Sequence, residues 1–100
     1  MNDVQPGPVA AAATAVEAER EVEMGSELGL HARPAATFAE TAAGFGCELT
    51  VAKGPTVVDA KSLLLLLTID ARRGDRLVIR GRGADAAEAV DRLAALLAGP

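Results

Sequence analysis

The chain has 100 residues, half of them apolar, which fits one compact domain with a single hydrophobic core and leaves no room for two. Its formal net charge of -4 argues against a nucleic-acid partner, because affinity for nucleic acid comes mainly from lysine and arginine side chains that neutralise phosphates. The aromatic residues are Phe38 and Phe45, so the core must be built mostly from small aliphatic side chains.

Residues 1–18 are expected to form a flexible extension and residues 19–100 the folded domain, because the first stretch is rich in proline and alanine and buries little. A short frayed helix from Val9 to Arg20 is the alternative. No lysine or arginine precedes the apolar run Val9–Val16, and the run is too short to span a bilayer. Cys47 has no second cysteine to pair with, so we expect a cytoplasmic protein without membrane insertion.

Charged and apolar residues alternate from Glu19 to Met24, which predicts a half-buried strand. A loop is expected over Gly25–Gly29. Apolar residues then recur at helical spacing and predict a helix over Pro34–Ala43, which Gly44 and Gly46 end. Alternation resumes from Cys47 to Val51 and, after a turn at Lys53–Pro55, continues over Thr56–Asp59, so these two segments are expected to form a hairpin.

Five consecutive leucines in Lys61–Thr68 favour a short helix over an alternating strand. A turn at Gly74 and Asp75 precedes a fourth strand over Arg76–Arg80. Asp85 and Glu88 have the spacing of a capping box, which predicts the start of a last helix that ends at Gly99. The order βαββαβα predicts an α+β two-layer sandwich, with three helices on one face of a largely antiparallel four-stranded sheet.

The motif GLHARPA contains His31, the one histidine of the chain, at the expected start of the first helix. Backbone N–H groups there lack helical acceptors and favour an anion. A neutral imidazole can attack phosphorus, and the planar guanidinium of Arg33 matches phosphate oxygens. Either His31 or Arg33 is expected to be the N-cap. A metal site is not expected because no second histidine is present, and neither Ser26 nor Cys47 has an evident catalytic partner.

The motif extends to GLHARPAA and is followed by VDAKSLLLLL and later by GADAAEAVDRLAALL. Together these stretches resemble the HPr family, the histidine-containing phosphocarriers of the phosphoenolpyruvate-dependent sugar phosphotransferase system, over roughly Arg20 to Leu97. The resemblance implies an open-faced βαββαβα sandwich that acts as a monomer without a cofactor. It also implies that His31 accepts a phosphoryl group on Nδ1 from phosphorylated enzyme I and passes it to an enzyme IIA. Arg33 and the N–H groups of Ala32 and Arg33 would steady the phosphate.

The five leucines, 63–67, cannot all be buried on a helix, because consecutive residues point around more than a full turn. They are either core residues with a few exposed neighbours or a docking surface. The resemblance favours docking of enzyme I and enzyme IIA on Leu63, Leu64 and Leu67. Arg72 and Arg73 would then steer acidic partners or simply be solvated.

Ser62 is expected to be the N-cap of this helix. It also matches the family's regulatory serine, which an HPr kinase phosphorylates in some bacteria. Family members often have a methionine and a glycine after this serine, where this chain has leucines, so recognition by the kinase does not follow from the resemblance.

The leading functional hypothesis is a phosphoryl carrier for sugar uptake, rather than an enzyme with its own small-molecule substrate. A paralogous carrier in a regulatory or nitrogen-linked phosphorelay would use the same chemistry at His31 with other partners. A regulatory binding module that is not phosphorylated is the third possibility, and the presence of both His31 and Arg33 argues against it.

Overall fold

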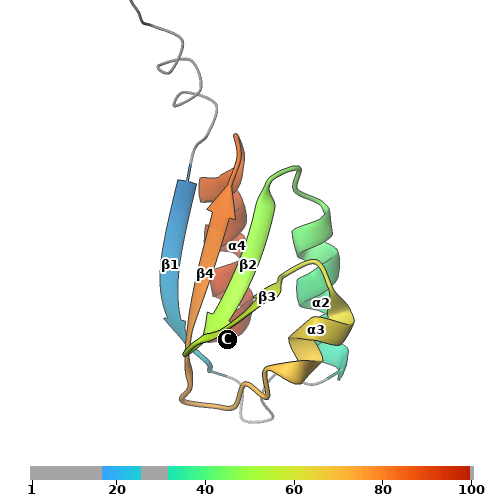
Figure 1. Ribbon diagram of the computed structural model, residues 1–100, viewed down its shortest axis with the longest axis vertical. Helices are drawn as coiled ribbons and strands as arrows, with labels where there is room; N and C mark the ends of the chain where they lie inside the picture. Colours follow the sequence, from blue (N-terminus) through green and yellow to red (C-terminus); the bar gives the residue numbers. More distant parts are fainter. Residues whose placement is uncertain (1–16, 26–31, 100) are drawn as a thin grey trace, which may run out of the picture.

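The computed structural model describes residues 17–25 and 32–99, in which three helices cover one face of a four-stranded antiparallel sheet (Figure 1). The elements are β1 (Glu17–Glu23), α2 (Ala32–Ala43), β2 (Glu48–Lys53), β3 (Thr56–Asp59), α3 (Leu63–Thr68), β4 (Arg76–Arg82) and α4 (Ala86–Ala98). The strand order is β1-β4-β2-β3, and each neighbouring pair is antiparallel. The predicted order of elements and the α+β sandwich are confirmed.

The core lies between the sheet and the helices. In β4, Leu77 and Ile79 are fully buried while Arg76 and Arg80 are exposed, so alternation along the strand separates a covered face from an open one. The helix α4 packs on β1 and β4, and α2 contacts both α3 and α4. Among the described residues no polar or charged side chain is buried, so the core is held by apolar packing around Phe38.

Several element boundaries differ from those predicted. The strands β2 and β4 continue to Lys53 and Arg82, so Lys53 belongs to a strand and not to the predicted turn, and β1 and α2 begin earlier than expected. The strand β1 begins at Glu17 because it pairs with β4 over its whole length, from Glu17 opposite Arg82 onwards. The helix α2 begins at Ala32, so Arg33 lies in the first turn and the prediction that it could be the N-cap is wrong. Pro34 is tolerated there because the first turn needs no N–H donor. Glu17 and Ala18 belong to the sheet and not to the extension predicted over residues 1–18; the rest of that extension lies outside the described residues, as do Ser26 and His31.

The predicted capping box at Asp85 is wrong, although Asp85 is the N-cap residue of α4. Its side chain makes no hydrogen bond to the helix; its Oδ2 instead accepts from the backbone N–H of Gly46 at 3.0 Å. This bond and one from the thiol of Cys47 hold the pKa of Asp85 below its usual range. Cys47 is buried in the core. Its burial raises the pKa of the thiol, and the hydrogen bond to Asp85 raises it further, which disfavours the nucleophilic thiolate.

At the other end of the sheet, the close approach of Gly25 to α4 holds the end of β1. The N–H of Gly25 donates to the carbonyl of Leu97 at 2.9 Å, and a Cβ added to Gly25 would lie 1.8 Å from the carbonyl oxygen of Ala98. The residue before it, Met24, is buried. The position at which β1 ends is therefore set by a backbone contact that only glycine permits.

We expect Gly25→Ala to destabilise the fold by about 1–3 kcal/mol, because the added methyl group must displace the last turn of α4. Gly46→Ala is the matched control, since a Cβ there meets nothing within 4 Å, and it should change stability by less than about 0.5 kcal/mol. Denaturant midpoints measure both. Equal midpoints for the two variants would contradict the close contact.

Folding should weaken in acid partly through Asp85. Its carboxyl is more acidic in the folded chain than in the unfolded chain, so its contribution is complete above the ordinary pKa of about 3.9 and is lost as pH falls through the lower folded-state pKa. Asparagine cannot ionise, so the free energy of unfolding of Asp85→Asn should change less between about pH 7 and pH 3. Urea denaturation across this range tests it, and equal pH dependence in both proteins would refute it.

Candidate functional site

The N-terminal turn of α2 presents the residues that follow His31. Ala32 and Arg33 are exposed, whereas Ala35 and Phe38 are buried and hold the helix against the core. No acidic side chain lies in this first turn. Backbone N–H groups without an acceptor in the helix, the helix dipole and a guanidinium therefore lie together at one helix end, an arrangement that favours a bound anion.

The helix α3 lies beside the start of α2 (Figure 1) and exposes most of its leucines. Leu66 is fully buried, but Leu64 is 77% exposed. We call the exposed set the leucine patch; its members are Leu63, Leu64, Leu65 and Leu67. The prediction that some leucines face outward is confirmed. Leu65 is also exposed, although it was not among the predicted docking residues.

Ser62 is the N-cap of α3, as predicted. Its backbone is extended, and its Oγ accepts from the N–H of Leu65 at 3.2 Å. The N–H of Leu66 donates to the carbonyl of Ser62 at 3.0 Å. Ser62 therefore determines where this six-residue helix starts.

Arg72 lies in the connection from α3 to β4. That connection runs at the end of the molecule where α2 starts (Figure 1). The guanidinium of Arg72 pairs with the carboxylate of Asp70 at 3.2 Å, which reduces the positive charge that it offers to a partner. Its backbone N–H donates to the carboxylate of Asp75 at 2.9 Å. That bond, and next the ammonium of Lys53, hold the pKa of Asp75 below its usual range.

Within the described residues, histidine, cysteine, aspartate and glutamate side chains form no group of three or more that could hold a metal ion. No helix in the same part of the chain has the length and apolar character needed to cross a membrane. The described site thus consists of the exposed first turn of α2, with Arg33, and the leucine patch beside it.

Comparison with known proteins places this chain in a family. The family model described as "PTS HPr component phosphorylation site" matches residues 18–99. The phosphocarrier protein HPr of Vibrio cholerae is 40% identical over 79 residues, which cover 79% of this chain and 93% of that protein. The phosphocarrier protein NPr of Shewanella violacea is 38% identical, with 79% and 87% covered. The multiphosphoryl transfer protein of Xanthomonas campestris is 40% identical over 95% of this chain, which spans only 11% of that protein.

Solved structures agree. The crystal structure of HPr from Bacillus anthracis superposes with a TM-score of 0.78 at 32% identity, covering 81% of this chain and 96% of that one. A crystal structure of Crh from Bacillus subtilis, described as a dimer with a swapping domain, has a TM-score of 0.65 at 33% identity, with 78% and 90% covered. The similarity therefore extends over sequence and fold together.

Proposed function

Because this chain belongs to the HPr family of phosphotransferase-system phosphocarriers, we propose that His31 accepts a phosphoryl group from phosphorylated enzyme I and passes it to an enzyme IIA during phosphoenolpyruvate-dependent sugar uptake. The observation that supports this most directly is the exposed first turn of α2, which follows His31 and presents Arg33 with no acidic neighbour in the turn. Such a turn suits a phosphoryl group attached to the residue before it.

In the proposed transfer, the lone pair of one imidazole nitrogen of His31 forms a bond to phosphorus while the bond from phosphorus to the donor's histidine breaks. The donor nitrogen recovers its lone pair. In a second exchange of the same kind, a histidine of enzyme IIA forms the bond to phosphorus while the bond to His31 breaks and His31 recovers its lone pair. The guanidinium of Arg33 and the N–H groups of Ala32 and Arg33 would spread the charge of the phosphoryl oxygens. Because Arg33 is exposed, its stabilisation is moderate, which keeps the phosphohistidine able to react.

The leucine patch is the proposed docking surface for both partners. Exposed leucines cost little on a free carrier and become favourable when a partner covers them. The patch adjoins the start of α2, so a partner docked on it also faces the residues that follow His31. The carrier is proposed to act as a monomer, since all seven residues of β1 pair with β4 of the same chain; a swapped dimer like that described for Crh is the alternative.

A carrier for a regulatory or nitrogen-linked phosphorelay is the second candidate. It is favoured by the similarity to NPr, whose 38% identity nearly equals the 40% of the HPr from Vibrio cholerae. The chemistry at His31 would be the same, and only the partners would differ. Incubation with enzyme I of the sugar system and with its nitrogen-linked counterpart, at equal concentrations, distinguishes the two candidates by the donor that phosphorylates faster.

We expect His31→Ala to abolish phosphoryl acceptance and leave the fold intact, because the variant removes the nucleophile alone. Wild type and variant are incubated with phosphoenolpyruvate and enzyme I and examined by intact mass and phosphorus NMR. Wild type should gain one acid-labile phosphate and the variant none, with unchanged circular dichroism. A phosphate retained by the variant would contradict the assignment of His31.

Leu64→Asp should raise the KM of enzyme I for the carrier about tenfold, because a charge replaces the most exposed leucine of the proposed docking surface. Leu96→Asp is the matched control: Leu96 is 43% exposed on α4, outside the leucine patch. Steady-state phosphorylation kinetics measure both variants. If both variants change KM equally, or neither does, docking does not use the leucine patch.

A further inference from the structure

Lys53, at the end of β2, joins two positions of the connection between α3 and β4. Its ammonium donates to the backbone carbonyl of Asp70 at 2.8 Å and pairs with the carboxylate of Asp75 at 3.0 Å. The side chains of Lys53 and Asp75 are only 35% and 32% exposed. The pair is therefore better shielded from solvent than the other ion pairs of the described surface, whose side chains are more than half exposed.

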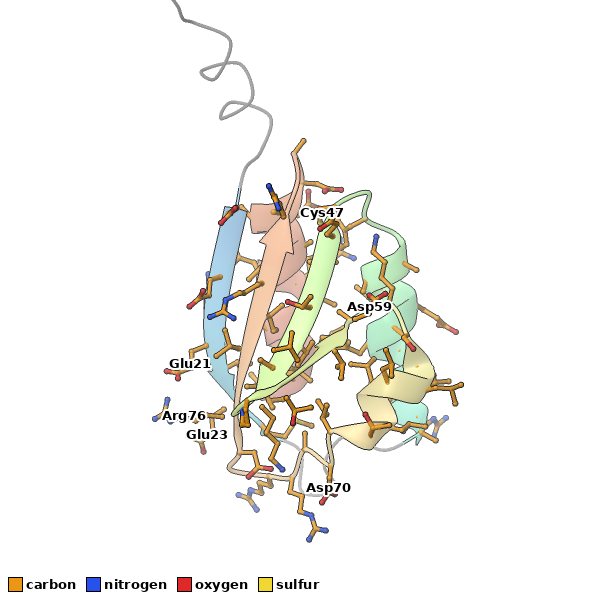
Figure 2. The ribbon with its side chains drawn as sticks, viewed as in Figure 1. Glu21, Glu23, Cys47, Asp59, Asp70 and Arg76 are labelled. Carbon is orange, nitrogen blue, oxygen red and sulfur yellow. The ribbon has the colours of Figure 1, made fainter. Side chains whose placement is uncertain are left out.

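The hydrogen bond from Lys53 to the carbonyl of Asp70 lies at the C-terminal end of α3. Asp70 follows Ile69, the C-cap residue of α3, and has a φ of +50°, in the left-handed region that non-glycine residues seldom adopt. Its neighbours Ile69 and Ala71 are both buried. Figure 2 shows Asp70 at the end of the sheet opposite Cys47. The ammonium of Lys53 thus supports a carbonyl whose orientation follows from an unusual backbone conformation.

The second contact holds the end of β1. Met24 donates its N–H to the carbonyl of Asp75 at 2.8 Å, and its own carbonyl accepts from the N–H of Gly74 at 2.8 Å. The next residue, Gly25, is bonded to Leu97. Six residues separate Gly25 from Ala32, and the last of them is His31. The loop that Lys53 contacts therefore adjoins both the end of α3 and the end of β1, after which the chain continues to His31.

We propose that Lys53 is a positioning residue for phosphoryl acceptance at His31: it holds the loop from Asp70 to Asp75 so that the leucine patch and the end of β1 keep a constant separation. This inference rests on the function proposed above. A partner docked on the patch then meets the first turn of α2, which follows His31, in one arrangement, as in-line transfer from nitrogen to nitrogen requires. Lys53 touches neither the phosphoryl group nor the partner in this role.

Three variants test the role of Lys53. Lys53→Met removes the charge and keeps the apolar stem, and Lys53→Arg restores donors to both oxygens. Arg80→Met is the matched control, because Arg80 forms an ion pair with Glu19 at 2.7 Å on the open face of the sheet, away from this loop. Phosphorylation by enzyme I and phosphoenolpyruvate gives kcat and KM for each carrier, and amide hydrogen exchange follows the N–H groups of Met24 and Gly74.

Lys53→Met should lower kcat about three- to tenfold, change KM less than about twofold, and speed exchange at Met24 and Gly74 selectively. Lys53→Arg should recover kcat to within about twofold of wild type, and Arg80→Met should match wild type. Unchanged kcat in Lys53→Met, an equal loss in Arg80→Met, or faster exchange across the whole sheet would overturn the role of Lys53. A wild-type chain that accepts no phosphoryl group would instead overturn the proposed function, and the role of Lys53 with it.

Discussion

The backbone contact between Gly25 and the last turn of α4 determines where the chain leaves the sheet before His31. The hydrogen bond to Leu97 and the absence of a Cβ bring the end of β1 against α4, while Met24 is bonded on its other side to Gly74 and Asp75. On the far side of the segment, α2 is held by the buried Ala35 and Phe38. The residues on both sides of the segment that contains His31 are thus held by contacts in which neither Ala32 nor Arg33, the residues proposed to bind the phosphoryl group, takes part.

The face of the sheet that none of the described helices covers carries charged side chains (Figure 1). Its β1 and β4 strands carry cross-strand pairs between glutamate and arginine, such as Glu19 with Arg80 and Glu21 with Arg76 (Figure 2 labels the latter pair). Exposed pairs add little stability. Their stronger effect is on association, since the row of glutamates along the edge strand β1 opposes pairing with a second copy of the same strand.

Local periodicity predicted most elements because they have their own apolar face, such as Leu77 and Ile79 in β4 or Val90 and Leu93 in α4. The helix α3 was predicted instead from the helix propensity of its leucines. The preference of serine for the N-cap position correctly predicted Ser62 at the start of α3. Local prediction failed at Asp85, whose spacing to Glu88 is typical of a local cap but whose carboxylate binds Gly46, 39 residues away. It also missed Lys53, whose role depends on contacts with Asp70 and Asp75 that exist only when the strands are paired. Contacts between distant segments leave no periodic signal in the sequence.

A helix of six residues does not persist alone in water. The helix α3 forms because Ser62 caps it, Leu66 enters the core, and the segment around Asp70 is buried on both sides. Because these three constraints fix the helix with Leu66 facing the core, the other leucines of α3 face solvent. In the proposed function, this exposed surface near the start of α2 serves two successive partners, of which a single phosphoryl group requires only one at a time. The exposed leucines and the exposed turn with Arg33 would then share one property in the proposed function: each leaves the carrier able to release what it binds.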